Sequence, residues 1–377
     1  MDSGVNDSNK YLEEAVMPEA YRLYAGTQSG MIIFRGVGDI WTSMGGSREF
    51  EPYFKEKVVD SVYGCKQNPE IVFAGVTFDG LYRTRNSGRH WDRVLEGDIR
   101  WVTVDPTDDR VIYAGTEPVH LYRSEDGGDS WEEIKSLVEM PEEVKYKWYF
   151  PQPPHQGHVR HINIDPENPK CLYLALEHGG IVRSFDRGQS WEDVSEGLEY
   201  PDIHMVVRSP SSKTKYFAAT SRGFFQADPP EKGWRRAEKG MESDYFHDVI
   251  HLPGDPAAMF LAAGHGSPQY WDRPGGVDGR IYRSEDGGQT WRQVGAGLPA
   301  KHTAMCWQLA YNPNNKNSIF AAFGDVARGH TAGSPGQGAI YVTYDRGDTW
   351  EEVALQKRGT KYLRPPAIRV LWVAADE

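Results

Sequence analysis

The sequence predicts an all-β protein, a seven-bladed β-propeller of four-stranded blades, and three observations lead to this prediction. One phrase recurs along the chain, an apolar strand precedes each copy, and the two ends of the chain supply strands that complement each other. Four clear copies of the phrase are LYRSEDGGDSWEEI, IVRSFDRGQSWEDV, IYRSEDGGQTWRQV and IYVTYDRGDTWEEV, which begin at Leu121, Ile181, Ile281 and Ile340. Repetition at such intervals is typical of stacked copies of one small β unit.

Each copy combines a strand, a tight turn and a returning strand. Alternation of apolar and other residues predicts the first strand. In the turn, an aspartate such as Asp126 can accept hydrogen bonds from backbone amides, and a glycine such as Gly128 tolerates a positive φ. The tryptophan that follows, such as Trp131, begins the returning strand and offers a large apolar surface to the neighbouring unit.

Tryptophans mark these units along the chain, including weaker copies such as the one in which Asn86 replaces the aspartate. The full set is Trp41, Trp91, Trp131, Trp191, Trp234, Trp291 and Trp350. A second apolar strand lies upstream of each, for example Tyr113-Ala-Gly-Thr. Units of about 40–50 residues are typical of propeller blades, so the sequence predicts seven blades.

A further strand precedes each of these and often ends in Asp-Pro or Asn-Pro, as in 100–106, 160–166 and 307–313. The first blade lacks this strand because the chain begins too close to Tyr24, and residues 369–373 supply it from the other end. Pairing the two ends closes the ring and removes free sheet edges. We expect one propeller domain over residues 19–377 after a polar tail over residues 1–18.

The repeated turn resembles the Asp-box, or BNR repeat, of sialidase-like and related propellers, which include photosystem assembly factors. Four copies fit the pattern fully, with their aspartates at Asp126, Asp186, Asp286 and Asp345. The resemblance covers most of the chain, but it identifies a turn and not an active site. Sialidases have six blades and an Arg-Ile-Pro segment near the start, whereas this chain has its only comparable segment at 363–366. It also lacks the two tandem propellers of the xyloglucan-cleaving family.

Composition narrows the classes of function. The formal net charge is −12 and the acidic residues are spread throughout without a basic block, which argues against a nucleic-acid partner. No apolar run reaches membrane-spanning length, and the acidic, polar N-terminus does not read as a secretory signal. The odd set Cys65, Cys171 and Cys306 falls on different blades, so we expect buried reduced thiols and a cytoplasmic location.

Three long insertions, at 135–158, 264–279 and 324–338, fall at one mouth of the channel in this topology. Long loops on one face of a rigid scaffold are a common place for binding and catalysis. Counting back from the proline that ends each inner strand predicts one ring of side chains there: Tyr63, Arg100, Arg160, His204, His247, Trp307 and Arg369. The ends of the second strands predict another: Ser29, Phe78, Pro118, His178, Ser221, His265 and Asp325, with Glu117 and Glu177 one residue earlier.

Histidines cluster on neighbouring blades of these rings. Imidazoles that converge with a carboxylate are what Zn, Mn, Fe or Cu require, so the sequence predicts a divalent transition-metal site. The predicted ligands are His178, His204, His247, His265 and Asp325. His158, His302 and His330 lie on neighbouring loops as a fourth ligand or a proton carrier. The alternative is that each histidine makes only a local hydrogen bond.

Arginines occupy the opposite side of the ring. Arg100, Arg160 and Arg369 present donor forks suited to carboxylate, phosphate or sulfate, or they pair with acids such as Asp98 and Glu117. Tyr63 and Trp307 are candidate stacking walls for a substrate ring, or channel packing.

Three functions follow from these candidates. The first is a metal-dependent enzyme that acts on a small anionic organic molecule by hydrolysis, β-elimination or oxygen chemistry. Its catalytic candidates are His302, His158, Tyr63 and Glu177. Seven-bladed lyases of acidic sugars resemble the arrangement for β-elimination, and carotenoid-cleaving oxygenases resemble the arrangement for oxygen chemistry. The second is a sialidase-like glycoside hydrolase, and the third is a scaffold similar to the assembly factors.

Overall fold

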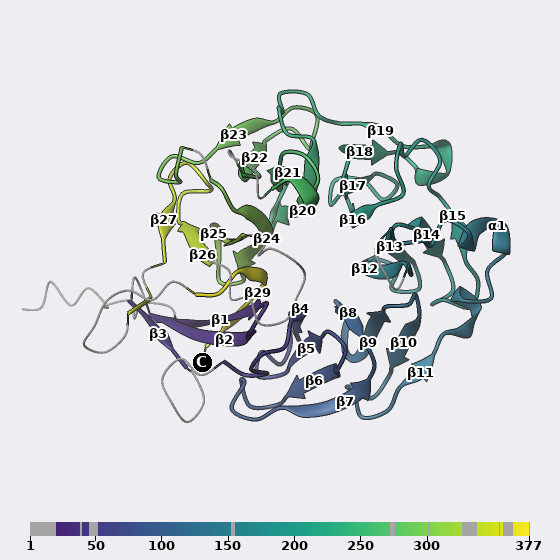
Figure 1. Ribbon diagram of the computed structural model, residues 1–377, viewed down its shortest axis with the longest axis horizontal. Coiled ribbons are helices and arrows are strands. Elements are labelled where there is room, and N and C mark those ends of the chain that lie inside the picture. Colours follow the sequence, from purple (N-terminus) through teal and green to yellow (C-terminus); the bar gives the residue numbers. More distant parts are fainter. Residues whose placement is uncertain are drawn as a thin grey trace, which may run out of the picture.

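The computed structural model describes residues 20–37, 40–44, 52–151, 155–271, 276–300, 302–325, 338–353, 355–356 and 365–376. These residues form an all-β propeller of seven blades arranged around a central channel (Figure 1). The described helices are one α-helix, α1 (Glu142–Lys145), and three 3-10 turns, η1 (Lys135–Leu137), η2 (Pro230–Lys232) and η3 (Pro268–Tyr270). The predicted fold class is confirmed. The predicted tail over residues 1–18 lies outside the described residues.

Neighbouring strands of each blade pair antiparallel from the channel outward. The innermost strands are β29 (Ile368–Ala375), β4 (Val59–Gly64), β8 (Ile99–Asp105), β12 (His158–Ile164), β16 (Ile203–Arg208), β20 (Tyr245–Leu252) and β24 (Met305–Asn312). The second strands are β1 (Ala20–Thr27), β5 (Val72–Val76), β9 (Asp108–Thr116), β13 (Leu172–Glu177), β17 (Tyr216–Thr220), β21 (Asp255–Gly264) and β25 (Asn315–Gly324).

The two outer positions complete the blades. The third strands are β2 (Gly30–Val37), β6 (Gly80–Thr84), β10 (Leu121–Ser124), β14 (Gly180–Ser184), β18 (Gly223–Ala227), β22 (Arg280–Ser284) and β26 (Gly338–Thr343). The outermost are β3 (Ile40–Ser43), β7 (Asp92–Glu96), β11 (Glu132–Glu133), β15 (Glu192–Asp193), β19 (Arg235–Arg236), β23 (Arg292–Val294) and β27 (Glu351–Glu352). A short strand, β28 (Leu355–Gln356), adds to β3 in parallel.

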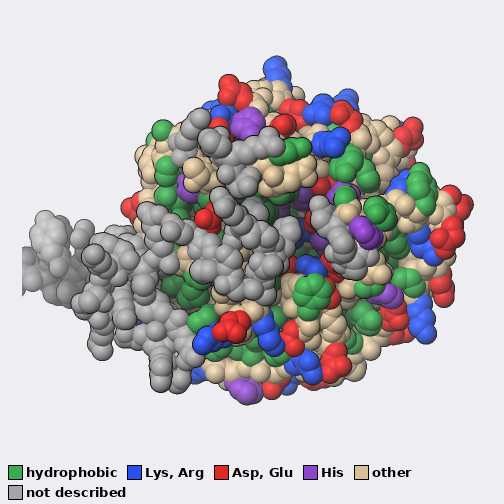
Figure 2. All heavy atoms as spheres, viewed as in Figure 1, with side chains coloured by type: hydrophobic (Ala, Val, Ile, Leu, Met, Phe, Trp, Pro, Cys, Tyr) green, Lys and Arg blue, Asp and Glu red, His purple; other side chains and the backbone are tan. Residues whose placement is uncertain are grey.

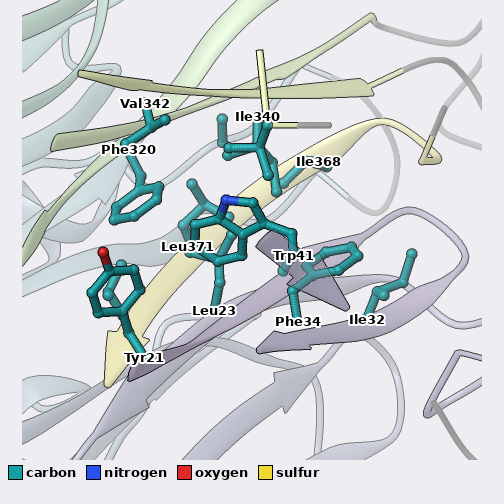
Figure 3. Close-up of a cluster of buried hydrophobic side chains, with 14 residues drawn as sticks. Tyr21, Leu23, Ile32, Phe34, Trp41, Phe320, Ile340, Val342, Ile368 and Leu371 are labelled. Atoms are coloured by element: carbon teal, nitrogen blue, oxygen red, sulfur yellow. The ribbon is translucent and has the colours of Figure 1, made fainter. Parts of the chain in front are cut away.

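The ring closes between the two ends of the chain, as predicted. Strand β1 pairs antiparallel with β29, with Leu23 opposite Val373, and Figure 1 shows the purple and yellow strands side by side. A buried cluster that includes Leu23, Trp41, Phe320 and Leu371 packs this blade against the last one (Figure 3). The Trp41 ring meets Phe320 edge-on, with centroids 5.6 Å apart.

The repeated turn is held by a small hydrogen-bond network at the face opposite the long loops. In one copy the Asp126 carboxylate accepts from the Ser130 hydroxyl (2.6 Å) and from the Ser130 amide (2.9 Å). The Gly128 amide donates to Ser124 Oγ (2.8 Å), and Gly128 has a φ of +87°. A Cβ there would lie 2.9 Å from the Phe73 ring of the preceding blade. The glycine is therefore required for both the turn and the blade contact.

The three cysteines are free and buried, which confirms the prediction of buried thiols. No helix in the described part of the chain is long and apolar enough to cross a membrane.

We predict that Trp41→Ala lowers the free energy of unfolding by about 3–5 kcal/mol, because it empties the cluster that closes the ring. Trp41 is 2% exposed, whereas its neighbour Ile40 is 62% exposed and serves as the matched control. Ile40→Ala should change stability by less than about 0.5 kcal/mol. Urea unfolding followed by tryptophan fluorescence and far-ultraviolet circular dichroism measures the free energy of unfolding of both variants. Equal losses in Trp41→Ala and Ile40→Ala would contradict the prediction that the closure cluster stabilises the ring.

Candidate functional site

Every innermost strand contains a β-bulge close to the channel mouth. In each blade one residue of this strand has no partner on the second strand, while the residues on either side of it are paired. The seven unpaired residues are Asp60, Arg100, Arg160, His204, His247, Trp307 and Arg369. Because a bulge redirects the side chain of its extra residue, the seven blades present one ring of side chains at this mouth.

The sequence predicted six members of this bulge ring correctly and one wrongly. Asp60, not Tyr63, is the unpaired residue of β4. In the second blade the count began at Pro69, in the loop after β4. This proline holds the same place in its loop as Pro169 of the fourth blade, whereas the count in the fourth blade began at the proline three residues before Pro169. The position in β4 was therefore placed three residues too far along the strand. Tyr63 lies further along β4, with its ring 4.6 Å from that of Trp372.

Six of the seven bulge-ring residues, all except Arg100, line a small hollow that is open to solvent. The residues that directly follow five of the bulges complete the lining: Trp101, Met205, Asp248, Gln308 and Val370. Burial raises the pKa of Asp248 to about 7, although its carboxylate accepts from the Leu309 amide at 2.6 Å. Figure 2 shows imidazole, guanidinium and carboxylate side chains around the centre of this face.

Carboxylates neutralise Arg100 on one side of the mouth. Its guanidinium contacts Asp60 (3.1 Å), Asp98 (2.9 Å) and Glu117 (2.8 Å). Asp60 also lies 3.3 Å from the Nε of Arg369. Burial alone would raise the pKa of Asp60, but the guanidinium groups of Arg369 and Arg100 hold it well below its usual range. The carboxylate stays ionised.

A buried imidazole lies between two glutamates of neighbouring blades. His158 places Nδ1 3.3 Å from Glu117 and Nε2 2.9 Å from Glu177. Glu177 also contacts the Nε of Arg160 at 3.3 Å. Burial would raise the pKa of Glu177, but His158 and Arg160 overcome this effect and hold it well below its ordinary value.

Two stacked histidines continue the network, and their partners determine their tautomers. His247 donates from Nδ1 to the Trp307 carbonyl (2.6 Å) and accepts at Nε2 from Arg160 (2.8 Å), so it is neutral. Burial, followed by the charge of Arg160, lowers the pKa of His247 well below its usual value. The ring of His204 stacks on His247 with centroids 5.0 Å apart.

His204 has an acidic and a phenolic neighbour at its free end. Its Nδ1 donates to the Phe246 carbonyl at 2.6 Å, which leaves the lone pair of the neutral ring on Nε2. That nitrogen lies 3.2 Å from the Tyr245 hydroxyl and 3.5 Å from Asp202. Burial, followed by the nearby charge of Asp202, raises the pKa of Tyr245 well above its usual value, so the phenol keeps its proton.

The predicted metal ligands do not assemble around one point. His204 and His247 use both ring nitrogens for protein hydrogen bonds, and His178 lies 3.7 Å from Asp202. His265 is directed to Asp244 (3.6 Å). Within the described ranges, no three His, Cys, Asp or Glu side chains are placed to hold a metal ion. This arrangement does not favour a metal centre, which stays a prediction.

Other predicted site residues lie at or beyond the edge of the mouth. His302 stacks on Phe323 (4.0 Å) and accepts at Nδ1 from the Ala304 amide (3.3 Å), while burial lowers its pKa to about 4. These contacts make it a packing residue between blades. Asp325 ends the described stretch after β25, and His330 lies outside the described residues.

Sequence reasoning missed three polar residues of this network: Asp60, Asp202 and Tyr245. A signal for two of them exists, because Asp202 and Tyr245 each lie two residues before a bulge-ring histidine. Asp98 and His158 lie two residues before Arg100 and Arg160 in the same way. Residues two apart in a strand face the same side of the sheet. The residue two positions before a bulge-ring residue is therefore a candidate member of the network, and this rule identifies all four of these residues.

No protein-family model matches the chain. The xyloglucanase of Hypocrea jecorina is 27% identical in an alignment of 156 residues that covers 35% of this chain and 17% of the enzyme. Among solved structures, the GH74 enzyme of Niastella koreensis aligns with a TM-score of 0.60 at 17% identity, over 78% of this chain and 45% of that one. A structure described as YCF48 bound to D1 peptide aligns with a TM-score of 0.56 at 16% identity, over 88% and 94%.

The chain thus spans less than half of the xyloglucanase and of the GH74 enzyme, and 94% of the YCF48 chain. At these identities the two structural matches show a shared propeller fold. They do not assign a reaction to the residues of this channel mouth.

We predict that Asp60→Asn destabilises the protein by about 3 kcal/mol at neutral pH, because it leaves Arg369 and Arg100 short of a buried partner. The pKa of Asp60 is lower in the folded state than in the unfolded state. Its ionic contacts therefore stabilise the fold above about pH 4, and this stabilisation is lost as the pH falls toward the folded-state pKa. The difference from the wild type should therefore shrink below about pH 4. Urea unfolding across this range tests it, with exposed Asp92→Asn as control; a difference independent of pH would contradict the argument.

Proposed function

We propose that the channel mouth is an active site for acid–base chemistry on a small organic anion. The observation that carries the proposal is the composition of the hollow. His204, with its lone pair on Nε2, shares the hollow with the guanidinium groups of Arg160 and Arg369. A proton acceptor beside two cations is suited to removing a proton next to a bound carboxylate.

The arginines provide the anchor for the anion. Arg160 uses Nε for Glu177 and Nη2 for His247, which leaves Nη1 for a ligand. Arg369 is oriented through Nε by Asp60, and its guanidinium carbon lies 5.1 Å from the centroid of the Trp307 ring. Neither Nη atom of Arg369 bonds to another residue in the described part of the chain. Guanidinium groups held this way lose little freedom when they bind a carboxylate.

His204 is the proposed base. Its Nδ1–H is fixed by the Phe246 carbonyl, so Nε2 takes the proton from the carbon beside the bound carboxylate. Asp202, at 3.5 Å, stabilises the imidazolium that forms. Tyr245 keeps its proton and its hydroxyl lies at Nε2 of the resting His204, and the imidazolium returns its proton to the leaving group or to the carbanion as the reaction ends. With a leaving group on the next carbon, the outcome is β-elimination.

A binding protein without catalysis is the second candidate, and one specific observation favours it. The similarity to YCF48 covers 88% of this chain and 94% of that one, and that structure contains a bound peptide. A peptide C-terminus would offer the same carboxylate to Arg160 and Arg369. The repeated turns, which we propose are Asp-boxes, fit this class as well as the first.

Glycoside hydrolysis is supported by the 27% identity to the xyloglucanase segment. A hydrolase of this kind needs two carboxyl groups on either side of a sugar bond. Glu117 and Glu177 both lie within 3.3 Å of His158, and neither lines the hollow. The arrangement therefore favours the first proposal over this one.

We predict that small carboxylates bind in the hollow and that Arg369→Gln weakens this binding at least about tenfold, since one charge-assisted contact contributes about 1.5–3 kcal/mol. Isothermal titration with acetate and with succinate measures it. Arg110→Gln is the control, since Arg110 is exposed, pairs with Asp108 and does not line the hollow. Unchanged affinity in Arg369→Gln would remove the anion anchor from the proposal.

We predict that the protein in D₂O exchanges the hydrogen next to the carboxylate of a bound acid, and that His204→Gln slows this exchange about 100-fold or more. Proton NMR on a panel of carboxylic acids follows the exchange even when no bond breaks. His90→Gln, an exposed histidine on a repeat turn, should keep full activity. If no acid of the panel exchanges, the non-catalytic candidate gains; stoichiometric Zn, Mn, Fe or Cu in purified protein would instead support the predicted metal centre.

A further inference from the structure

Exposed aromatic rings lie beside the charged network on the loop face of the propeller. The most exposed is Phe78, which follows β5 and has 79% of its surface accessible. Its ring centroid lies 5.4 Å from the guanidinium carbon of Arg100, the bulge-ring residue of the next blade. A large apolar side chain in this position contributes little to the stability of the fold, because no other part of the protein covers it.

The backbone conformation of Phe78 adds a second argument. Its φ is +58°, a left-handed conformation that an aromatic residue rarely adopts and that costs free energy. The site's own carboxylates hold the turn in place. The Phe78 amide donates to Asp98 (3.0 Å) and the preceding Thr77 hydroxyl donates to Asp60 (3.0 Å). The network that orients Arg100 therefore also fixes the ring above it.

Further rings continue along the same side of the mouth. Phe150 lies 6.0 Å from His158 and edge-on to His178 at 5.0 Å. Tyr200 lies 5.6 Å from His178, and its other neighbour is the guanidinium of Arg222, 4.0 Å from the ring centroid. Phe150 and Tyr200 are half-buried, so the side of the mouth beside the ionic network carries one exposed and two partly exposed aromatic rings.

We infer that this aromatic rim, defined by Phe78, Phe150 and Tyr200, binds a ring attached to the carboxylate that enters the hollow. The inference rests on the proposed function and narrows its substrate class to acids whose rings have an apolar face. Such a face stacks on an exposed aromatic side chain, while the acid group reaches the arginines below. An acidic sugar and an aromatic acid share this chemistry.

The test compares three probes on wild type, Phe78→Ala and Arg369→Gln by isothermal titration. Phenylacetate carries an aromatic ring, a trimer of galacturonate carries sugar rings, and acetate carries none. We expect a ring-bearing acid to bind more tightly than acetate, and Phe78→Ala to weaken its binding roughly threefold to tenfold while leaving acetate unchanged. Whichever ring-bearing acid shows this loss identifies the source of the ring.

Phe185→Ala is the matched control. Phe185 is also an exposed phenylalanine (55%), and it too lies beside an arginine, with Arg183 at 4.4 Å, but it sits in a repeat turn on the opposite face. The Phe185→Ala variant should bind every probe with the affinity of the wild type. A thermal melt of each variant confirms folding, and Phe78→Trp should restore the affinity for ring-bearing acids.

The outcomes separate the two levels of the proposal. If Phe78→Ala binds all probes like the wild type while Arg369→Gln loses them, the aromatic rim is overturned and the anion site stands. If Phe78→Ala weakens ring binding but Arg369→Gln does not, the rim stands and the anion anchor falls. Equal affinity of the wild type for acetate and both ring-bearing acids also overturns the rim.

Discussion

One bulged residue in each innermost strand determines what this propeller presents at its channel mouth. A regular strand would alternate its side chains between the two neighbouring blades, and the channel would receive few of them. The bulge leaves one residue unpaired and redirects it, so Asp60, Arg100, Arg160 and their counterparts form one ring. The hollow, the ionic contacts and the histidine tautomers all depend on this repeated irregularity.

The ring brings many charged groups out of bulk water, and their mutual contacts decide their ionisation. Asp60 and Glu177 remain carboxylates because arginine and histidine neighbours outweigh their burial. The same contacts leave His247 neutral, since Arg160 donates to it. Few of these groups can change charge independently, so the network holds Arg160, Arg369 and His204 in fixed positions before any ligand arrives.

The comparisons and the site answer different questions. The GH74 enzyme and the YCF48 structure share the propeller fold with this chain, and a shared fold does not determine a function. The acid–base proposal therefore depends on the contacts of His204, Arg160 and Arg369 in this chain. The proposal for the exposed Phe78 also depends on contacts in this chain. Its left-handed conformation is maintained by a hydrogen bond to the site and not by packing in the core.

The sequence alone determined the number of blades, the closure of the ring by its two ends and six of the seven bulge-ring residues. These follow from local regularities: the tryptophan spacing, the strand period and the proline that ends most inner strands. It failed at Tyr63, where one proline occupied a different place in its loop, and the metal centre that it proposed stays a prediction. Only the tertiary structure decided that Nδ1 of His204 bonds to the Phe246 carbonyl and that the Tyr245 hydroxyl meets Nε2. Those contacts join neighbouring blades, whose residues no local pattern of the sequence brings together.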